Sequence, residues 1–227
     1  MIGHLPKSRV RGANYKYGFS GCYFDLDARF GTNTKTDLAA ISSWSDQIAG
    51  VSYTHATAGN QPRYIAADSN FNNFPSIQRQ TSARWLGSIN GVGIRQGFTL
   101  VYVGKVDTNN GANSCLENNP TLGGSAGDII LALTPTVLLG SDAADLTTAI
   151  DNTSPFILVA NTNELWINGV QQVTGNIKLT RTINTLGRNG SGSNDVGRTT
   201  RLMLFEGIGG SSFAQLSDNV NKDYLAY

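Results

Sequence analysis

The stretch PFILVANTNELWINGVQQV, Pro155 to Val173, decides the fold. Its first part, Phe156 to Val159, is a short continuous apolar run of the kind found in strands that are covered on both faces. Two further apolar segments flank Asn168-Gly169, the dipeptide that most readily supplies the two positive φ angles of a two-residue hairpin turn. A buried strand followed by a tight hairpin predicts a β-sheet protein.

Strand patterns continue on both sides of this stretch. Phe98 to Val106 (FTLVYVGKV) is the cleanest alternating strand, and Thr199 to Phe205 has apolar residues on both faces. Near the start, Cys22 to Asp27 (CYFDLD) places Asp25 and Asp27 on the same face, because side chains alternate between the faces of a strand. Together with 26 glycines, these patterns predict short strands joined by frequent turns.

The last element is predicted to be a helix that docks on the sheet. Ser212 followed by Gln215 matches a capping box, in which the two side chains bond backbone amides at the start of a helix. Four apolar residues share one helical face at spacings of 3, 4 and 4: Phe213, Leu216, Val220 and Tyr224.

Composition limits the range of partners. The 227 residues are enough for one all-β domain. With 15% charged residues and a formal net charge of +1, the chain has no overall electrostatic field that would attract nucleic acid or an anionic membrane. No apolar core follows the basic residues near the start, and no run approaches about 20 apolar residues, so neither a signal peptide nor a membrane span is predicted. Cys22 and Cys115 are predicted to be free thiols in a protein made in a cytoplasm.

Residues 1–18 are predicted to form an extended arm, because they are rich in Lys, Arg, Gly and Tyr and show no clear alternation. In one reading the arm packs along its own domain. In the other it docks on a neighbouring subunit, with tyrosines as buried anchors and basic residues that pair with carboxylates. The residues assigned to that docking are Lys7, Arg9, Arg11, Tyr15 and Tyr17.

Four short motifs follow one another along the chain: Trp-Ser-Asp at Trp44, Gln-Pro-x-Tyr at Gln61, Pro-x-Ile at Pro75 and Leu-Trp-Ile-Asn-Gly at Leu165. This succession resembles the concanavalin A-like, laminin-G-like jelly-roll family, of the type found in structural proteins of tailed-phage virions. The resemblance implies an all-β fold, an antiparallel β-sandwich over residues 19–227 with the N-terminal arm before it and a short C-terminal helix at its end.

Carboxylates and histidines do not form a recognisable catalytic set. Glycoside hydrolases of the same superfamily carry Glu-x-Asp-x-x-Glu on one strand, whose carboxylates serve as nucleophile and acid. The three glutamates Glu117, Glu164 and Glu206 do not have this spacing. The two histidines, His4 and His55, offer little material for a triad or a Cys-His pair. We therefore expect no catalytic residues and no enzymatic activity.

Asp25 and Asp27 are the candidate calcium ligands, since both carboxylates lie on one strand face. They can hold a calcium ion together with backbone carbonyls, or they can accept hydrogen bonds from loop amides instead. Calcium needs six or more oxygen ligands, and no acidic cluster follows the pair. The cysteines and histidines lack the paired spacing of a zinc site. Calcium is thus the one candidate cofactor that stays open, and no bound cofactor is expected.

Polar loops and tryptophans are the candidates for glycan binding. An exposed aromatic ring can stack on the apolar face of a pyranose while Asn, Asp and Arg side chains bond its hydroxyls. Trp44, Trp85 and Trp166 can act in this way, or they can pack in the core and the hairpin. In the loops, the candidate glycan-binding residues are Asn109, Asn113, Arg188, Asn194 and Asp195.

The family resemblance, together with the basic arm, the low charge and the missing catalytic set, implies a structural protein of a phage virion, either a capsid decoration or accessory protein or a tail-associated subunit. Its expected partners are other virion proteins, including further copies of itself, and it would be synthesised in the host cytoplasm. The alternative is a lectin-like, carbohydrate-binding module for attachment to the host surface. A hydrolase is the third hypothesis, and it requires a carboxylate pair that the sequence does not display.

Overall fold

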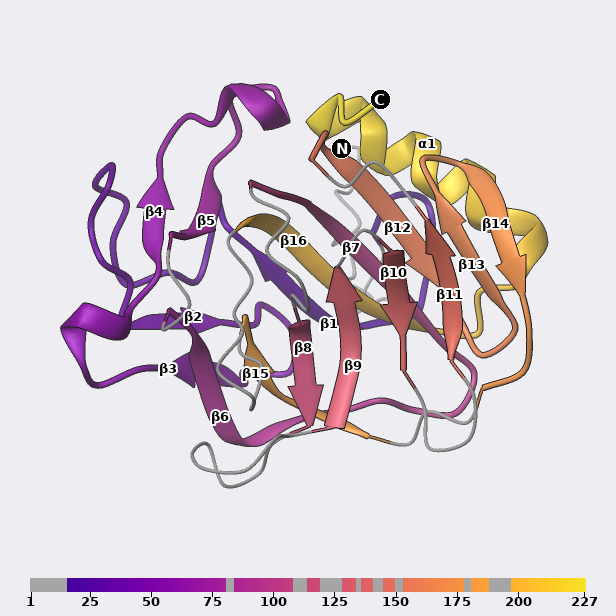
Figure 1. Cartoon of the computed structure of the whole chain (residues 1–227), viewed down its shortest axis with the longest axis horizontal. Coiled ribbons are helices and arrows are strands. Elements are labelled where there is room, and N and C mark those ends of the chain that lie inside the picture. Colours follow the sequence, from indigo (N-terminus) through magenta and orange to yellow (C-terminus); the bar gives the residue numbers. More distant parts are fainter. Residues whose placement is uncertain are drawn as a thin grey trace, which may run out of the picture.

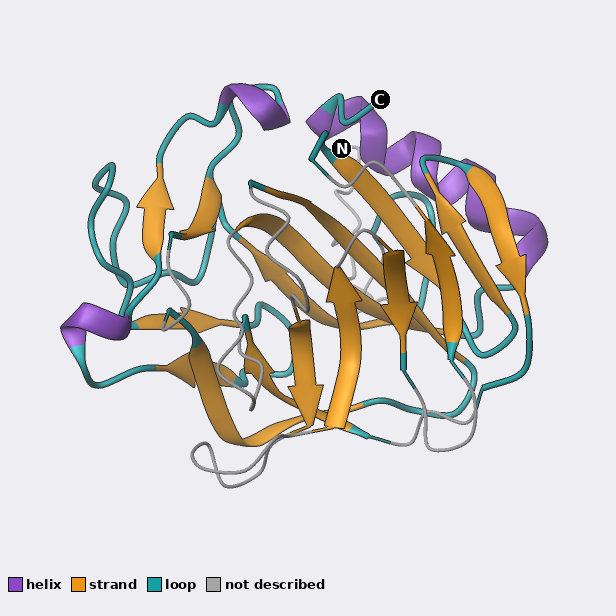
Figure 2. Cartoon of the chain, viewed as in Figure 1, coloured by secondary structure: helices purple, strands orange, loops and turns teal. Residues whose placement is uncertain are grey.

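The computed structural model describes residues 16–80, 84–107, 114–118, 128–133, 136–140, 145–149, 153–177, 181–187 and 197–227. Two antiparallel sheets are stacked face to face, and one helix lies against the outside of one of them (Figure 1). Coloured by secondary structure, the chain is mostly strand with its helical segments at the periphery (Figure 2). The predicted antiparallel β-sandwich with a short C-terminal helix is confirmed. In the parts listed above, every helix is too short or too polar to cross a membrane.

The first sheet contains the fold-deciding stretch. Its order is β14-β13-β12-β7-β16-β5-β4, and β1 also pairs with β16. In that order the strands are β14 (Val170–Thr174), β13 (Glu164–Ile167), β12 (Phe156–Ala160), β7 (Phe98–Val106), β16 (Gly197–Glu206), β5 (Ser76–Arg79), β4 (Arg63–Ile65) and, beside β16, β1 (Cys22–Asp27).

The second sheet has the order β11-β10-β9-β8-β15-β6-β3-β2. The Asn/Gly-rich stretch between Asp107 and Gly127 is interpreted from its sequence as a long loop or a weak hairpin at the surface. The structure forms strand β8 (Ser114–Asn118) within it, paired with β9, and Cys115 of β8 is buried. In sheet order the strands are β11 (Leu146–Ala149), β10 (Thr136–Leu139), β9 (Asp128–Leu133), β8 (Ser114–Asn118), β15 (Thr182–Leu186), β6 (Leu86–Gly93), β3 (Ser52–Thr54) and β2 (Ser43–Ser45).

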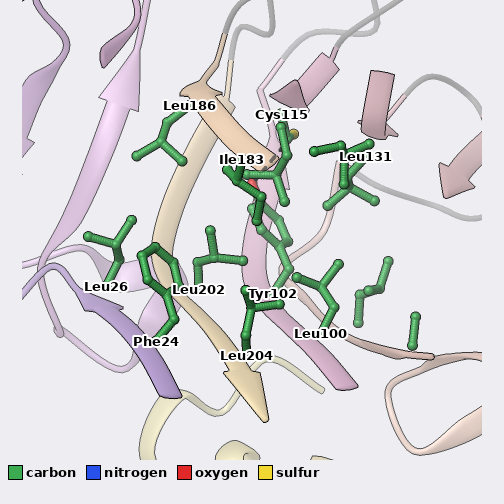
Figure 3. Packing of buried hydrophobic residues seen from close by; sticks show 14 of the residues in the cluster. Phe24, Leu26, Leu100, Tyr102, Cys115, Leu131, Ile183, Leu186, Leu202 and Leu204 are labelled. Carbon is green, nitrogen blue, oxygen red and sulfur yellow. Dashed lines mark hydrogen bonds between the residues drawn. The ribbon is translucent and has the colours of Figure 1, made fainter. Parts of the chain in front are cut away.

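The main core lies between the two sheets (Figure 3). Alternate residues of β7 and β16 point into it, as their sequence patterns predict, and the other faces of these strands are also buried. The first sheet contributes Phe24, Leu26, Leu100, Tyr102, Leu202 and Leu204, and the second contributes Cys115, Leu131, Ile183 and Leu186.

Helix α1 (Phe213–Tyr224) covers part of the outer face of the first sheet, against residues such as Val101 and Met203. All four residues of its predicted apolar face are buried. The predicted capping box is wrong, because Ser212 makes no side-chain cap hydrogen bond and ends the short helix η3 (Gly210–Ser212). A turn of 3₁₀-helix leads directly into α1 instead.

The hairpin between β13 and β14 turns at Asn168 and Gly169, with φ angles of 51° and 75°. These are the two positive φ values that the Asn-Gly dipeptide was predicted to supply. The Asn168 side chain adds a second function, since its Oδ1 accepts a hydrogen bond from the Ile157 backbone amide at 2.8 Å. The turn is therefore tied to the central strand β12.

Candidate functional site

A pocket of about 540 Å³ opens at the edge of the sandwich, where β14 of the first sheet and β11 of the second come together beneath the last residues of the chain. It combines apolar residues with hydroxyl and amide groups. The lining residues are Ala149, Ser154, Pro155, Ile167, Asn168, Val170, Gln172, Ala226 and Tyr227.

Tyr227 supplies the aromatic surface of this pocket. The side chain is 46% exposed, and its hydroxyl donates to Asp218 Oδ1 at 2.9 Å and lies 3.2 Å from Ser217 Oγ. Both partners belong to α1, so the helix holds the ring in place. Burial raises the pKa of Tyr227, and Asp218 raises it further, so the phenol stays protonated at neutral pH.

The β13–β14 hairpin forms one wall of the pocket. Gly169 approaches the end of α1 so closely that a Cβ there would lie 3.3 Å from the Tyr227 hydroxyl oxygen. Ile167 is buried, whereas Val170 is 61% exposed and Gln172 is exposed at the rim. The wall thus offers an apolar base and a polar edge.

This combination of groups suits a small, uncharged, polar ligand. An aromatic ring beside apolar side chains can cover the C–H face of a sugar, and hydroxyl and amide groups can bond its hydroxyls. The lining residues named above include no carboxylate, thiol or imidazole. The sequence analysis did not predict the pocket, because Ala149 and Ser154 lie far from Tyr227 in the chain. The Asn-Gly hairpin, which forms one wall, was the one part of the pocket that the sequence predicted.

The loop residues predicted to bind glycans cannot be compared with this pocket. Asn109, Asn113, Arg188, Asn194 and Asp195 all lie outside the described residues. Their assignment stays a prediction.

The structure describes only the end of the predicted arm. Lys7, Arg9, Arg11 and Tyr15 lie outside the described residues. Tyr17 is engaged within its own chain: its hydroxyl donates to Asp223 Oδ2 at 2.9 Å and accepts from Arg201 Nη1 at 2.5 Å. The side chain that we expected to anchor a neighbouring subunit therefore fastens the arm to its own domain.

The two candidate calcium ligands, Asp25 and Asp27, share a face as predicted but are both neutralised by arginine. Arg201 binds both oxygens of Asp25, at 2.9 and 2.8 Å, and lies 3.2 Å from Asp27. Arg29 binds Asp27 at 2.6 Å. Burial opposes ionisation of Asp27, but the hydrogen bonds and charges of these arginines outweigh it and lower the pKa. The carboxylates thus form ion pairs, and no group of three or more acidic, His or Cys side chains suited to a metal occurs in the described ranges.

The three tryptophans have different environments. Trp44 is 2% exposed and donates through Nε1 to the Asp27 carbonyl at 3.2 Å, so it belongs to the core. Trp166 donates to Glu164 at 2.7 Å and packs edge-on against Phe213 of α1. Trp85 is half-buried. Trp166 is half-buried as well.

Both cysteines are free, as predicted, and both are buried. Burial raises the pKa of Cys22 to about 12, and the nearby Asp25 raises it in the same direction, so the thiol stays protonated. Cys115 lies in β8, and its Sγ is 3.7 Å from the Tyr102 hydroxyl. Neither cysteine is arranged as an activated thiolate.

Comparison with known proteins gives matches to solved structures only, since no family model and no curated protein matches the sequence. The chain is similar to Trypanosoma rangeli sialidase in complex with 2,3-difluoro-KDN, with 14% identity, a TM-score of 0.57 and coverage of 97% of this chain and 36% of that one. It is also similar to domain 4 of AbnA, a GH43 extracellular arabinanase from Geobacillus stearothermophilus, in complex with arabinotriose, with 14% identity, a TM-score of 0.58 and coverage of 88% and 98%. A GH54 α-L-arabinofuranosidase matches with 12% identity, a TM-score of 0.59 and coverage of 93% and 61%.

These neighbours correct one expectation. The sequence analysis predicted no enzymatic activity, and this prediction is contradicted because the structures named above are all glycosidases or parts of them. The chain spans only about a third of the length of the sialidase. No phage or concanavalin A-like protein is among the neighbours named here. At these identities the likeness shows the fold alone, and the chain shares the all-β sandwich of these glycosidase structures.

Proposed function

We propose that the chain is a saccharide-binding β-sandwich domain and that the Tyr227 pocket is its binding site for neutral sugar. The observation that carries the proposal is the half-exposed Tyr227 ring, held over an apolar pocket by two hydrogen-bonding partners on α1. Rigid aromatic side chains with a polar end are well suited to sugar because the ring covers C–H groups and little conformational entropy is lost.

The arabinanase neighbour supports the proposal and suggests a first ligand. Its domain 4 is matched over 98% of its length, and that structure contains arabinotriose. The shared fold does not transfer the ligand to this chain, but it makes arabinose oligosaccharides the first compounds to test. The other hypothesis for the same fold, a concanavalin A-like module for attachment to a host surface, uses the same kind of contact.

Binding is tested by titrating the protein with arabinotriose, xylotriose and maltotriose in a calorimeter. We expect at least one to bind, and we expect Tyr227→Ala to weaken it about tenfold, because an aromatic contact of this size contributes about 1.5 kcal/mol. Gln172→Ala should weaken binding about fivefold through loss of a hydrogen bond at the rim. Gln171→Ala is the matched control, since Gln171 is the neighbouring exposed glutamine and its amide bonds Glu164 instead.

Equal affinity of the Tyr227→Ala variant and the parent protein, with unchanged melting curves, would refute the assignment of the pocket. Failure of all three sugars to bind would also count against it. The same mixtures should be analysed for shortened oligosaccharides, because the structural neighbours are glycosidases. Shortened products that disappear in Tyr227→Ala would extend the proposal from binding to hydrolysis.

We also propose, from the family resemblance, that the chain is part of a phage virion and joins other virion proteins through residues 1–15. One observation favours a docking role for residues 1–15 alone. Lys16 and Tyr17 contact their own domain, through Asp25 and Arg201 respectively. Removing Met1 to Asn14 keeps these anchors. We therefore expect the truncated protein to fold, to keep its melting temperature within about 2 °C, and to be lost from purified particles. Full incorporation of the truncated form would contradict the docking role.

A further inference from the structure

A second cluster of binding groups lies at the other end of the first sheet. The Trp85 backbone amide donates to the Asn60 carbonyl at 3.1 Å, which joins the segment before β6 to the segment before β4. Arg84 directly precedes Trp85, and Arg63 begins β4 three residues after Asn60. The two arginines thus belong to chain segments that are joined by a backbone hydrogen bond.

Cross-strand pairing puts Arg63 on the outward face of the sheet. Arg63 is opposite Gln78 of β5, and Gln78 is opposite Arg198 of β16. Residues that face each other in antiparallel strands share one side of the sheet. The neighbouring Tyr64 and Ile77 belong to the main core, so this row points away from it.

Two glutamine amides connect Arg84 to the same row. Gln80 Nε2 donates to Gln78 Oε1 at 3.0 Å, and Arg84 Nη1 donates to Gln80 Oε1 at 3.3 Å. Arg63, which is opposite Gln78, and Arg84, which is linked to Gln78 through Gln80, therefore border the same polar row. Burial lowers the pKa of Arg84, and the positive charge of Arg63 lowers it further, as expected for two cations that lie close together.

The charge of this pair is not balanced. Arg198, in the same row, lies 3.0 Å from Asp68 and 3.1 Å from Asp107. In the described part of the chain, by contrast, neither Arg63 nor Arg84 has a carboxylate within ion-pair distance. Arg84 Nε is also buried without a hydrogen-bond acceptor, a situation that costs about 1–3 kcal/mol. Both arginines thus have no carboxylate partner among the described residues, and Gln78 beside them donates to Asp107 at 3.4 Å.

An aromatic residue directly follows Arg84 in the chain. The half-buried Trp85 ring packs edge-on against His55, with ring centroids 4.4 Å apart and an interplanar angle of 84°. His55 is held in turn, since its Nδ1 accepts from the Thr57 amide at 3.1 Å and its carbonyl accepts from Gln61 at 2.7 Å. The orientation of Trp85 is therefore set by its surroundings.

We propose that Arg63 and Arg84 bind the oxyanion of an acidic saccharide, a carboxylate or a sulfate, while Trp85 contacts its sugar ring. Guanidinium groups suit both oxyanions because their N–H donors match a pair of oxygens. This site is separate from the Tyr227 pocket: β4 and β14 are the two ends of the strand order in the first sheet and lie on opposite sides of the molecule (Figure 1). The inference therefore goes beyond the neutral-sugar site and does not depend on it.

The test is calorimetric titration at low ionic strength with four probes: a galacturonic acid trisaccharide, the neutral galactose trisaccharide, a sulfated galactose trisaccharide, and inorganic phosphate. We expect one or both acidic trisaccharides to bind at least about tenfold more tightly than the neutral one, since a hydrogen bond to a charged group contributes about 1.5–3 kcal/mol. Preference for the carboxylate or the sulfate probe identifies the oxyanion. Quenching of tryptophan fluorescence that disappears in Trp85→Phe is expected to accompany binding.

Arg63→Gln and Arg84→Gln should each weaken the acidic sugar about tenfold or more. Arg95→Gln is the matched control, since Arg95 is an exposed arginine paired with Glu206 away from the site, and it should leave affinity unchanged. If Arg84→Gln fails to fold, Arg63→Gln alone decides. Equal loss in Arg95→Gln, no loss in Arg63→Gln, no binding of either acidic sugar, or binding of phosphate as tight as that of the sugars would each overturn the proposal.

Discussion

Replacing Arg201 by glutamine is expected to lower the free energy of unfolding by about 3 kcal/mol or more, because it leaves the buried Asp25 without its main counter-charge and removes one of the two arginines that pair with the buried Asp27. The Arg201 side chain is 3% exposed, and those of Asp25 and Asp27 are each 1% exposed. Lys16 still contacts Asp25, and Arg29 still contacts Asp27, which places the loss near the lower end of the range for broken buried pairs.

Urea denaturation of the parent and Arg201→Gln proteins measures this difference. Arg95→Gln serves as the control, because the Arg95–Glu206 pair is exposed on both sides and such pairs contribute about 0–1 kcal/mol. A loss below about 1 kcal/mol in Arg201→Gln would contradict the prediction, since it would show that the remaining cations satisfy both carboxylates. Both variants remove one positive charge. The difference between their losses in unfolding free energy therefore measures the effect of burying the ion pair.

Deleting Asn219 to Tyr227 is expected to destabilise the domain by about 3–6 kcal/mol. The deletion removes Val220 and Tyr224, which are fully buried, and burial of such side chains contributes about 1.5–3 kcal/mol each as an upper bound. It also removes the Asn219 amide that donates to the Tyr17 carbonyl at 2.9 Å. The remaining part of α1 is then too short to be stable without strong packing.

The melting temperature of the deletion variant gives the result directly, and an unchanged value would show that the end of α1 is dispensable. Tyr224→Ala is the corresponding point variant and should account for much of the loss. Lys222→Ala is its control, since Lys222 is exposed on the same turn and donates to the Asn219 side chain. We expect the control to change stability by less than about 0.5 kcal/mol.

The two predictions are coupled through one buried layer. The Tyr224 hydroxyl lies 3.5 Å from Arg201 Nη1, and the Tyr17 hydroxyl bonds both Arg201 and Asp223. The end of α1, the start of the domain and the ion pairs of β1 and β16 therefore stabilise one another. We expect the combined variant to lose less than the sum of the separate losses, because residues in one network do not act independently.

Local patterns were enough to predict much of the fold. Alternation along Phe98 to Val106, the apolar run of Phe156 to Val159 and the Asn168-Gly169 turn each depend on neighbouring residues, and each was observed. The apolar face of α1 was likewise read from its spacing. The region of strand β8 was expected to be a long loop or a weak hairpin, because Asn and Gly dominate its surroundings and their turn preference is stronger than the signal of Ser114–Asn118.

The sequence by itself determined the sheet class, the hairpin and the buried helical face, because periodicity and turn preference act between residues close in the chain. Only the tertiary structure decided that Arg201 neutralises Asp25, a residue 176 positions away. It also placed Tyr227 beside the β13–β14 hairpin and joined the segment of Arg84 to the segment of Arg63 through a backbone hydrogen bond. Ion pairs and binding sites arise where strands and segments distant in sequence pack side by side, and no local pattern encodes which of them meet.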